Sequence, residues 1–447
     1  MTGVLVEPSR RPLLVPERVA RRVGHRVNRR AVPTARVVGA VVLAAFTLVI
    51  AGPNLPTALL PAYRQAYRMT PFGLSLLFSA YLLLLVPTLV LCMRPALRAR
   101  ADALLAIGLG AAVVADVLMA TAGSTVMLLT GRALSGVSVA LSTGAAAALM
   151  VALVGERGRG SVATGNIVGA LVGTVGAVAL AQIGIGSTVY LVHAVATSVV
   201  LTALLLALAA RSAGDTAALQ TGGIQAEISD GPAVKVPVTT VTPGVIRRHR
   251  LLGTAVGALG WAIPGLVTGL VPSLLRQFTG PAAVIVATSP AILLLACAWL
   301  LQVLARRPLL RFVRGHELTV GTAMGTVGLA LLAAGALTAS LPLVYLGCAI
   351  AAGGPAMGYR GGMVLLTRGL DPSRQGAVTS RYAAGSYAFS AVVVLGSGAI
   401  GAIGGLVTAV AVGAGALTVL GVGLLAVILV TEHLMVAYRS DVAVVRS

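Results

Sequence analysis

Residues 125–151 read TVMLLTGRALSGVSVALSTGAAAALMV, an apolar run whose single charged side chain is Arg132. A helix that crosses the hydrocarbon core of a bilayer needs about 20 mostly apolar residues. The run is continuous and does not alternate between polar and apolar positions, which favours a helix over a strand of a membrane barrel. This stretch therefore predicts a membrane-spanning helix.

The rest of the chain repeats this pattern. Of its 447 residues, 57% are hydrophobic and only 10% are charged, whereas soluble domains carry about 25% charged residues. We therefore predict an all-α polytopic membrane protein with twelve transmembrane helices. Short links such as Gly123-Ser124 require neighbouring helices to run antiparallel. The predicted spans are residues 37–59, 71–93, 102–122, 125–151, 161–183, 187–210, 251–274, 280–303, 317–338, 341–365, 378–400 and 403–431.

The twelve spans divide into two groups of six. Residues 211–250 lack the apolar density for a core of their own and read as a linker. An acid-x-x-Arg pattern follows the fourth span at Glu156 and Arg159, and it recurs after the tenth span at Asp371 and Arg374. The predicted parts are a basic tail (1–36), a six-helix bundle (37–210), a linker (211–250), a second six-helix bundle (251–431) and a second tail (432–447).

Basic residues indicate the orientation. The net charge of +21 would suit a nucleic-acid-binding domain if the basic residues formed one soluble face. They lie instead in short clusters between apolar runs, so we predict no nucleic-acid partner. Of the 33 arginines and lysines, 28 fall on the side of the two termini and 3 on the opposite side. Since positive residues stay in the cytoplasm, we predict a cell inner-membrane protein with both termini and the linker in the cytoplasm.

The stretch from Leu128 to Ala140 resembles the fourth-helix signature of the major facilitator superfamily, in which an arginine is followed four residues later by glycine, here Arg132 and Gly136. The resemblance implies two six-helix halves that alternate access to a central cavity. Helices 1, 4, 7 and 10 would form most of that cavity, with faces of helices 2, 5, 8 and 11.

The sequence departs from the family pattern at two places. Leu97 stands where the family's loop between helices 2 and 3 usually has an acid, which alters any latch that depends on that acid. Ala170 follows Gly169 in the fifth span, where proton-coupled drug exporters of the family often have a proline. The second departure disfavours drug–proton antiport as the specific activity.

Glycines and prolines predict close packing and bends. Gly165, Gly169 and Gly173 recur every four residues, a spacing that lets two helices approach closely, and we interpret it as helix packing. A proline leaves a carbonyl without its helical donor, so kinks cluster near cavities and hinges, although a purely structural kink is the alternative. The prolines within spans are Pro53, Pro56, Pro87, Pro264, Pro272, Pro290 and Pro355.

Few polar residues lie inside the predicted spans. An unpaired charge there costs at least about 2.5–3.5 kcal/mol, so each should have a partner or line water. For the aromatic residues, interfacial anchoring or packing is the alternative, and we interpret His193 as an interfacial histidine. The predicted substrate-cavity residues are Asn54, Tyr81, Arg132, Trp261, Tyr359, Arg360 and Tyr387, and the predicted cytoplasmic gating charges are Arg98, Glu156, Arg159, Asp371 and Arg374.

Asp116 and Arg132 lie eight residues before and eight residues after Ser124, in the link between the third and fourth spans. At 1.5 Å rise per residue, both lie at a depth of about 12 Å. We therefore predict that they form an ion pair or lie one water apart. If protonation of Asp116 breaks this pair, it is also the candidate proton-coupling element. The alternatives are a permanent pair that only fixes the hairpin, or side chains that face different ways because depth does not set helix rotation.

The sequence predicts transport rather than catalysis. It contains no phosphate-binding Gly-x-x-x-x-Gly-Lys pattern and no cluster of His, Cys or acidic residues, so we predict no enzyme, no cofactor and no metal. We predict a monomeric secondary active transporter in the lipid bilayer, an exporter of a small organic molecule with protons as the candidate coupling ion. Arg132 and Arg360 would favour an anionic or neutral substrate. The alternatives are an uptake permease or facilitator, or a non-transporting membrane receptor or enzyme.

Overall fold

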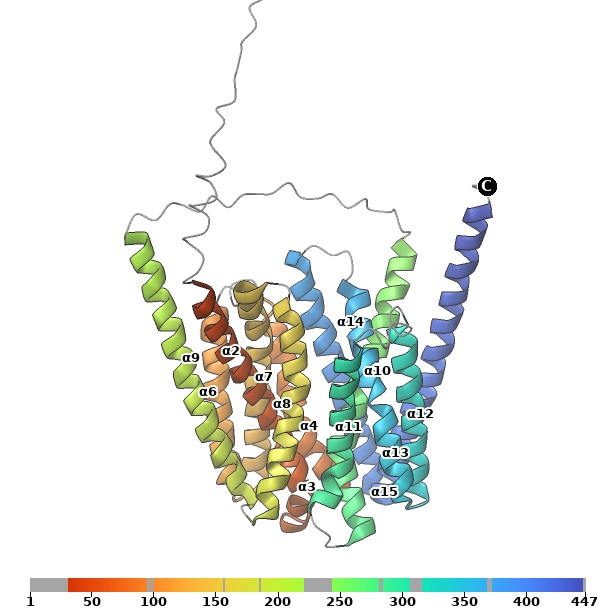
Figure 1. The fold of residues 1–447 in the computed structure, drawn as a ribbon. Helices are drawn as coiled ribbons and strands as arrows, with labels where there is room; N and C mark the ends of the chain where they lie inside the picture. Colours follow the sequence, from red (N-terminus) through yellow and green to blue (C-terminus); the bar gives the residue numbers. More distant parts are fainter. Residues whose placement is uncertain are drawn as a thin grey trace, which may run out of the picture.

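The structure, a computed structural model, describes residues 31–94, 97, 100–155, 157–184, 186–220, 243–280, 284–305, 316–367 and 372–444. Within these ranges the regular elements are helices (Figure 1). They are α2 (Ala31–Ala51), η1 (Gly52–Asn54), α3 (Pro56–Ala66), α4 (Pro71–Leu91), α6 (Ala101–Ala120), α7 (Thr125–Val154), α8 (Arg157–Gln182), η2 (Gly186–Thr188), α9 (Val189–Gln220), α10 (Pro243–Thr279), α11 (Val284–Leu304), α12 (Glu317–Leu337), α13 (Leu341–Ala351), η4 (Gly354–Gly358), α14 (Tyr359–Thr367) and α15 (Pro372–Val444).

Among the described residues, 11 helices are long and apolar enough to cross a membrane. This finding confirms a multi-pass, all-α membrane protein. The first ten of these helices correspond one to one to the first ten predicted spans. The last, Val378–Thr431, covers both remaining predicted spans as one apolar helix of 54 residues.

A sharp reversal divides α15 into two arms. Gly405 has φ 80° and ψ −179°, a backbone region open essentially only to glycine. The chain turns back at this residue, and the second arm rises to the C-terminus (Figure 1). A Cβ on Gly401 would lie 2.7 Å from Cβ of Ala409, and a Cβ on Gly413 would contact Ser397. In each contact the two residues lie equally far along the sequence on either side of Gly405. The two arms therefore pack antiparallel as a helical hairpin.

Two of the predicted proline sites break their helices. The first span, Ala35–Ala66, consists of α2, the 3-10 turn η1 and α3, with Pro53 inside the turn and Pro56 at the start of α3. The tenth span is interrupted by the π-helical turn η4, which contains Pro355. In contrast, α4, α10 and α11 remain continuous helices with their prolines inside.

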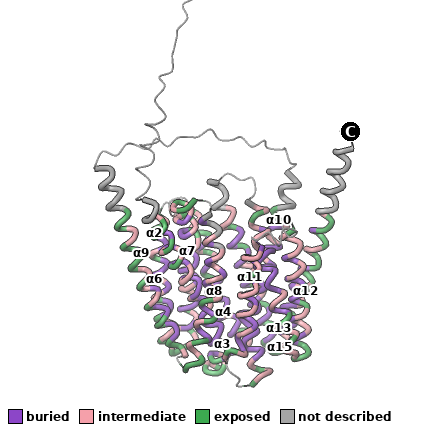
Figure 2. Tube along the Cα trace, in the orientation of Figure 1, coloured by how far each residue is buried: buried purple, intermediate pink, exposed green. Residues whose placement is uncertain are grey.

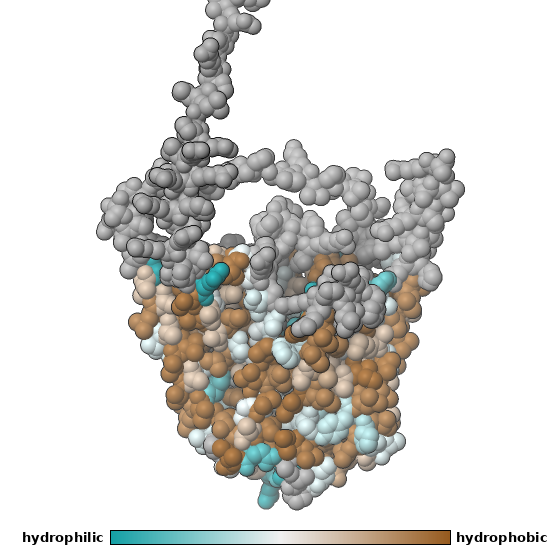
Figure 3. Space-filling model, in the orientation of Figure 1, coloured by the Kyte–Doolittle hydropathy of each residue, from teal (hydrophilic) through white to brown (hydrophobic). Residues whose placement is uncertain are grey.

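Burial is greatest where the two halves of the chain meet. In an apolar 18-residue stretch of Arg250–Thr279, within α10, 83% of the residues are buried, against 22% in such a stretch of Gly186–Arg211, which includes the first part of α9. Figure 2 shows the same contrast between the centre and the outer helices. The first half contacts the second through α4 with α15, α8 with α11, and α3 with α10. Hydrophobic side chains dominate the described outer surface (Figure 3), as a lipid-facing surface requires.

The glycines of the fifth span pack against the first. Gly169 and Gly173 on α8 face α2, and a Cβ on Gly169 would lie 2.5 Å from the carbonyl oxygen of Thr47. A Cβ on Gly173 would collide with the backbone of Ala51. Interpretation of this series as helix packing is therefore confirmed.

Replacement of Gly173 by alanine should destabilise the protein, because α8 and α2 would have to separate. Overpacking of this kind costs about 1–3 kcal/mol. Gly176, on the same helix, has open space where its Cβ would lie, so Gly176→Ala is the matched control. We expect Gly173→Ala to lower the thermal unfolding temperature in detergent and Gly176→Ala to leave it unchanged or raise it slightly. Equal effects of the two substitutions would contradict this packing.

Candidate functional site

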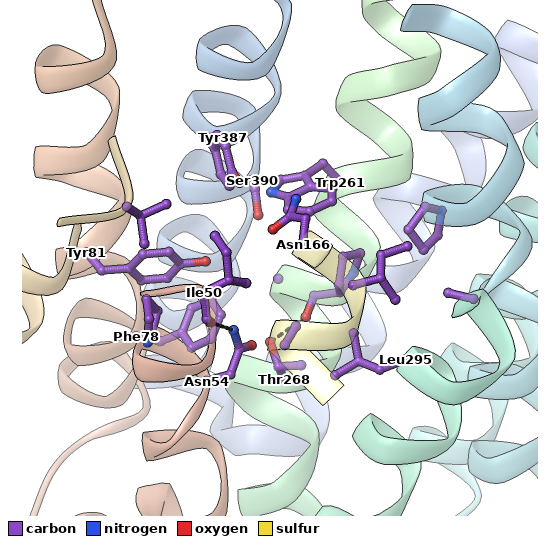
Figure 4. A pocket seen from close by; sticks show the side chains of 18 residues that line it. Ile50, Asn54, Phe78, Tyr81, Asn166, Trp261, Thr268, Leu295, Tyr387 and Ser390 are labelled. Atoms are coloured by element: carbon purple, nitrogen blue, oxygen red, sulfur yellow. Dashed lines mark hydrogen bonds between the residues drawn. The ribbon is translucent and has the colours of Figure 1, made fainter. Parts of the chain in front are cut away.

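A cavity of about 60 Å³ lies between the two halves of the chain (Figure 4). Eight of the spans contribute to it, four from each half: the first, second, fourth and fifth, and the seventh, eighth, tenth and eleventh in the predicted order. This is the set of helices that the family resemblance implied. The lining residues are Ile50, Pro53, Asn54, Phe78, Tyr81, Val139, Asn166, Ile167, Ala170, Trp261, Pro264, Gly265, Thr268, Leu295, Ala298, Pro355, Tyr387 and Ser390.

None of these lining side chains carries a charge at neutral pH. Four polar groups face one another across the cavity, Asn54 and Asn166 from the first half and Thr268 and Ser390 from the second (Figure 4). Asn54 Nδ2 donates to the Ile50 carbonyl at 2.8 Å, and Thr268 Oγ1 donates to the Pro264 carbonyl at 2.6 Å. Both groups therefore keep oxygen lone pairs that can accept hydrogen bonds from a bound molecule.

An aromatic cluster forms one wall of the cavity. Trp261 lies with its ring centroid 5.0 Å from that of Tyr359 and 5.2 Å from that of Tyr387. Tyr382 extends the cluster, 4.9 Å from Tyr359. Tyr387 also interacts electrostatically with Asn166 on the other half. The cluster thus connects the seventh, tenth and eleventh spans and reaches across to the fifth.

The structure brings together most of the predicted cavity residues. Asn54, Tyr81, Trp261 and Tyr387 line the cavity, and Tyr359 packs behind Trp261. Sequence reasoning missed the polar groups Asn166, Thr268 and Ser390. Asn166 could have been predicted as a cavity residue from the sequence, because an amide inside an apolar span needs hydrogen-bond partners. Thr268 and Ser390 could not have been predicted in this way, since serine and threonine in helices commonly form hydrogen bonds with their own backbone.

Arg360 lies outside the cavity. Its Nε is 3.9 Å from a carboxylate oxygen of Glu317, and its side chain is 39% exposed. The two-arginine cavity on which we based an anionic preference is therefore absent.

Arg132 is buried beside the cavity and donates to three backbone carbonyls. Its Nη1 donates to Pro53 at 2.7 Å, its Nη2 to Phe78 at 3.0 Å and its Nε to Leu77 at 3.2 Å. The guanidinium also lies 4.6 Å from the ring centroid of Tyr81. Carbonyl dipoles and a ring face thus stabilise a charge that would be costly alone.

The predicted ion pair between Asp116 and Arg132 is wrong. Asp116 Oδ2 lies 2.6 Å from Nδ1 of His193 on α9, while Arg132 faces α4 and η1. The equal depth of the two residues does not bring them together, because the rotation of α6 directs Asp116 toward α9. The His193 side chain is buried, and its Nε2 lies 2.9 Å from the Leu48 carbonyl oxygen.

These contacts meet at the break in the first span. The carbonyl of Leu48 contacts His193, that of Ile50 accepts from Asn54, and that of Pro53 accepts from Arg132. Side chains thereby satisfy carbonyls around a break where prolines and a 3-10 turn interrupt the regular helical bonds.

The predicted cytoplasmic gating charges receive no structural description. Arg98, Glu156 and Asp371 lie outside the described residues. Arg159 and Arg374 lie within α8 and α15, but their side chains also fall outside the described part.

Replacement of Arg132 by lysine should destabilise the protein strongly. An ammonium group cannot reproduce the planar guanidinium's contacts with three separate carbonyls, and a buried acceptor left unpaired costs about 1–3 kcal/mol. Arg360→Lys is the matched control, because Arg360 is partly exposed and makes only a long contact with Glu317. We expect a clear fall in the thermal unfolding temperature for Arg132→Lys only, and comparable curves for both variants would refute the role assigned to these bonds.

Comparison with known proteins gives matches at the level of structure. No family model and no curated protein matches the sequence. A bacterial homologue of the human lysosomal transporter Spinster superposes with a TM-score of 0.62 and 14% identity, over 90% of this chain and 97% of that one. The nucleoside transporter NupG gives 0.59 and 12%, over 88% and 98%. The human organic anion transporter MFSD10 gives 0.55 and 16%, over 88% and 99%.

These similarities show that the chain shares its fold with these membrane transporters. Sequence identities of 16% or less establish a shared fold but do not identify the substrate. The substrate class must therefore be inferred from the cavity.

Proposed function

We propose that the protein is a secondary active transporter that exports a small organic molecule by alternating access. The observation that carries this proposal is the cavity itself, which lies between two halves that share the transporter fold and is lined equally by both. The sequence contains no nucleotide-binding motif that could supply ATP energy, so the driving force would be an ion gradient.

The packing around the cavity supports a cycle in which the halves separate. We call the end of the molecule that carries residues 67–70, 121–124, 338–340 and Gly405 the distal end. There seven of the 11 residues of α3 are buried, and α3 packs on α10 and α8. Gly398 and Gly401 of α15 approach Pro71 and Ser75 of α4. The cavity of about 60 Å³ is smaller than the roughly 300–1,000 Å³ of pockets for drug-sized ligands. A substrate would therefore enter only after the halves move apart.

The same fold supports twelve membrane crossings. Counted separately, the two arms of the α15 hairpin raise the number of spans from 11 to twelve. An even number of spans would place both termini on one side of the membrane, and the distribution of arginines supports the cytoplasm as that side. The distal end would then face the exterior.

Reporter fusions test this topology. A reporter at residue 447 and one within residues 211–250 should both report the cytoplasm, and one inserted at Gly123 should report the exterior. A reversed signal at either of the first two sites would contradict the twelve-span arrangement.

The cavity supports a neutral, largely aromatic substrate. Its wall offers Trp261, Tyr81, Tyr387 and Phe78 for stacking, and its few polar groups offer hydrogen bonds without charge. A charged ligand would lose hydration and gain no opposite charge, at a cost of about 2.5–3.5 kcal/mol if it lay at the membrane midplane. Arg132, behind Tyr81, would further disfavour a cation.

Intrinsic fluorescence can test binding directly, because the chain has only two tryptophans. Trp261 lines the cavity and Trp299 is 39% exposed on the outer surface. In the Trp299→Phe variant, neutral bicyclic aromatic compounds should change the emission of Trp261 saturably. An aromatic carboxylate and a quaternary ammonium compound of similar size should bind at least about tenfold more weakly, because each 1.4 kcal/mol corresponds to a factor of ten.

The Trp261→Phe variant, which keeps Trp299, is the matched control and should show no saturable change. Compounds that bind are then tested for movement into proteoliposomes with and without a pH gradient. Equal binding of charged and neutral compounds would refute the substrate class, and binding without movement under either condition would refute transport.

A further inference from the structure

The buried pair Asp116 and His193 contacts the break in the first span. Asp116 comes from α6 and His193 from α9, and both side chains are only 6% exposed. His193 lies between two oxygens, the Asp116 carboxylate at 2.6 Å from Nδ1 and the Leu48 carbonyl at 2.9 Å from Nε2. A Cβ on Gly52, the first residue of η1, would lie 3.2 Å from the imidazole ring. The pair therefore touches the first span where its helix is interrupted.

The two oxygens restrict the protonation states that satisfy both contacts. A carbonyl only accepts, so Nε2 must carry a hydrogen to bond Leu48. A second hydrogen must then lie between Nδ1 and Asp116. This is met by an imidazolium with a carboxylate, or by a neutral imidazole with a carboxylic acid, and both arrangements have zero net charge. In a bilayer, a neutral pair avoids the cost of an isolated ion.

Release of one proton from this pair breaks one of its contacts. If the remaining hydrogen stays on Nδ1, the Nε2 lone pair faces the Leu48 carbonyl oxygen. If it stays on Nε2, the Nδ1 lone pair faces the Asp116 carboxylate. Either arrangement opposes two lone pairs and leaves a net negative charge in an apolar setting, so the deprotonated pair favours a different geometry.

The other charged and titratable groups described around the pair do not supply a hydrogen in place of the released proton. Tyr190 lies one turn before His193 on α9 and interacts with Asp116, and its hydroxyl lies 3.1 Å from that of Tyr63 on α3. Both phenols are neutral at physiological pH. Arg132 on α7 is bonded to carbonyls. The more distant charges on the packed helices, at least about 15 Å away along each axis, are Arg36 on α2, Asp102 on α6 and Arg211 on α9.

The break connects the pair to the distal end. Beyond η1 the chain continues as α3, whose first six residues are buried and which packs against α10 and α8. We propose that Asp116 and His193 form the proton-binding element of the transport cycle: the bound proton holds the break in the geometry that closes the distal end, and its release lets α3 move away from α10. This inference rests on the proposed transport function and assigns His193 as a positioning residue that acts through the first span.

Spin labels across the distal end provide a test that needs no substrate. Gln65 near the end of α3 and Gln277 near the end of α10 are both exposed, and each is replaced by cysteine in a full-length background in which Cys92, Cys297 and Cys348 are alanine. The separation of the two labels is measured from about pH 5 to about pH 9, the range that brackets histidine titration. We expect a short separation at acid pH and a longer one as the pH rises.

The Asp116→Asn variant should keep the short separation at every pH. An asparagine amide can donate to Nδ1 while a neutral imidazole donates to Leu48, so both contacts persist without the titrating proton. His193→Gln, whose amide can also donate to Leu48, should likewise lose the pH response. His316→Gln, at an exposed position before α12, is the matched control and should retain it.

Three results would overturn the proposal: no pH-dependent change in the parent, the same change in both Asp116→Asn and His193→Gln, or loss of the change in His316→Gln. None of these readings depends on a ligand. Failure of this inference is therefore distinguishable from failure of the proposed function, which is measured by the fluorescence of Trp261.

Discussion

The break in the first span is the feature on which the rest of the structure depends. Inside a bilayer no water replaces a missing helical hydrogen bond, so every carbonyl around the break needs a partner from the protein. Arg132 supplies one partner and His193 another. These two residues in turn fix the rotations of α7 and α9, and Asp116 fixes that of α6 by its contact with His193. A local defect in one helix thereby organises the first half of the chain.

The second half is organised differently, through aromatic packing and close backbone contacts. Trp261, Tyr359 and Tyr382 stack in succession, and the π-helical turn η4 carries Pro355 to the cavity. The described part of this half places no buried charge beside the cavity. The two walls of the cavity therefore have different chemistry: a side-chain network that can bind a proton lies behind one wall, and a hydrophobic stack forms the other.

The fold was largely predictable because hydrophobicity and length determine membrane spans with little dependence on tertiary context. The cavity was predictable at the level of helices, and for Asn54, Tyr81, Trp261 and Tyr387 at the level of residues. The partner of Asp116 was not, because depth follows from counting residues whereas helix rotation does not. His193 lies seven residues beyond Gly186, in the next hairpin, so its depth is comparable to that of Arg132. The sequence gave no basis for choosing between His193 and Arg132 as the partner of Asp116.

The hairpin of α15 has a consequence for how the protein enters the membrane. From residue 382 to residue 431 the chain contains no charged side chain, so no basic loop directs the last two arms during synthesis. The turn that joins the two arms contains no charged residue. The turn between the two arms is set by the backbone of Gly405 and not by a charged loop. Charge can therefore orient this hairpin only from its two ends, through Arg381 before the first arm and Arg439 after the second.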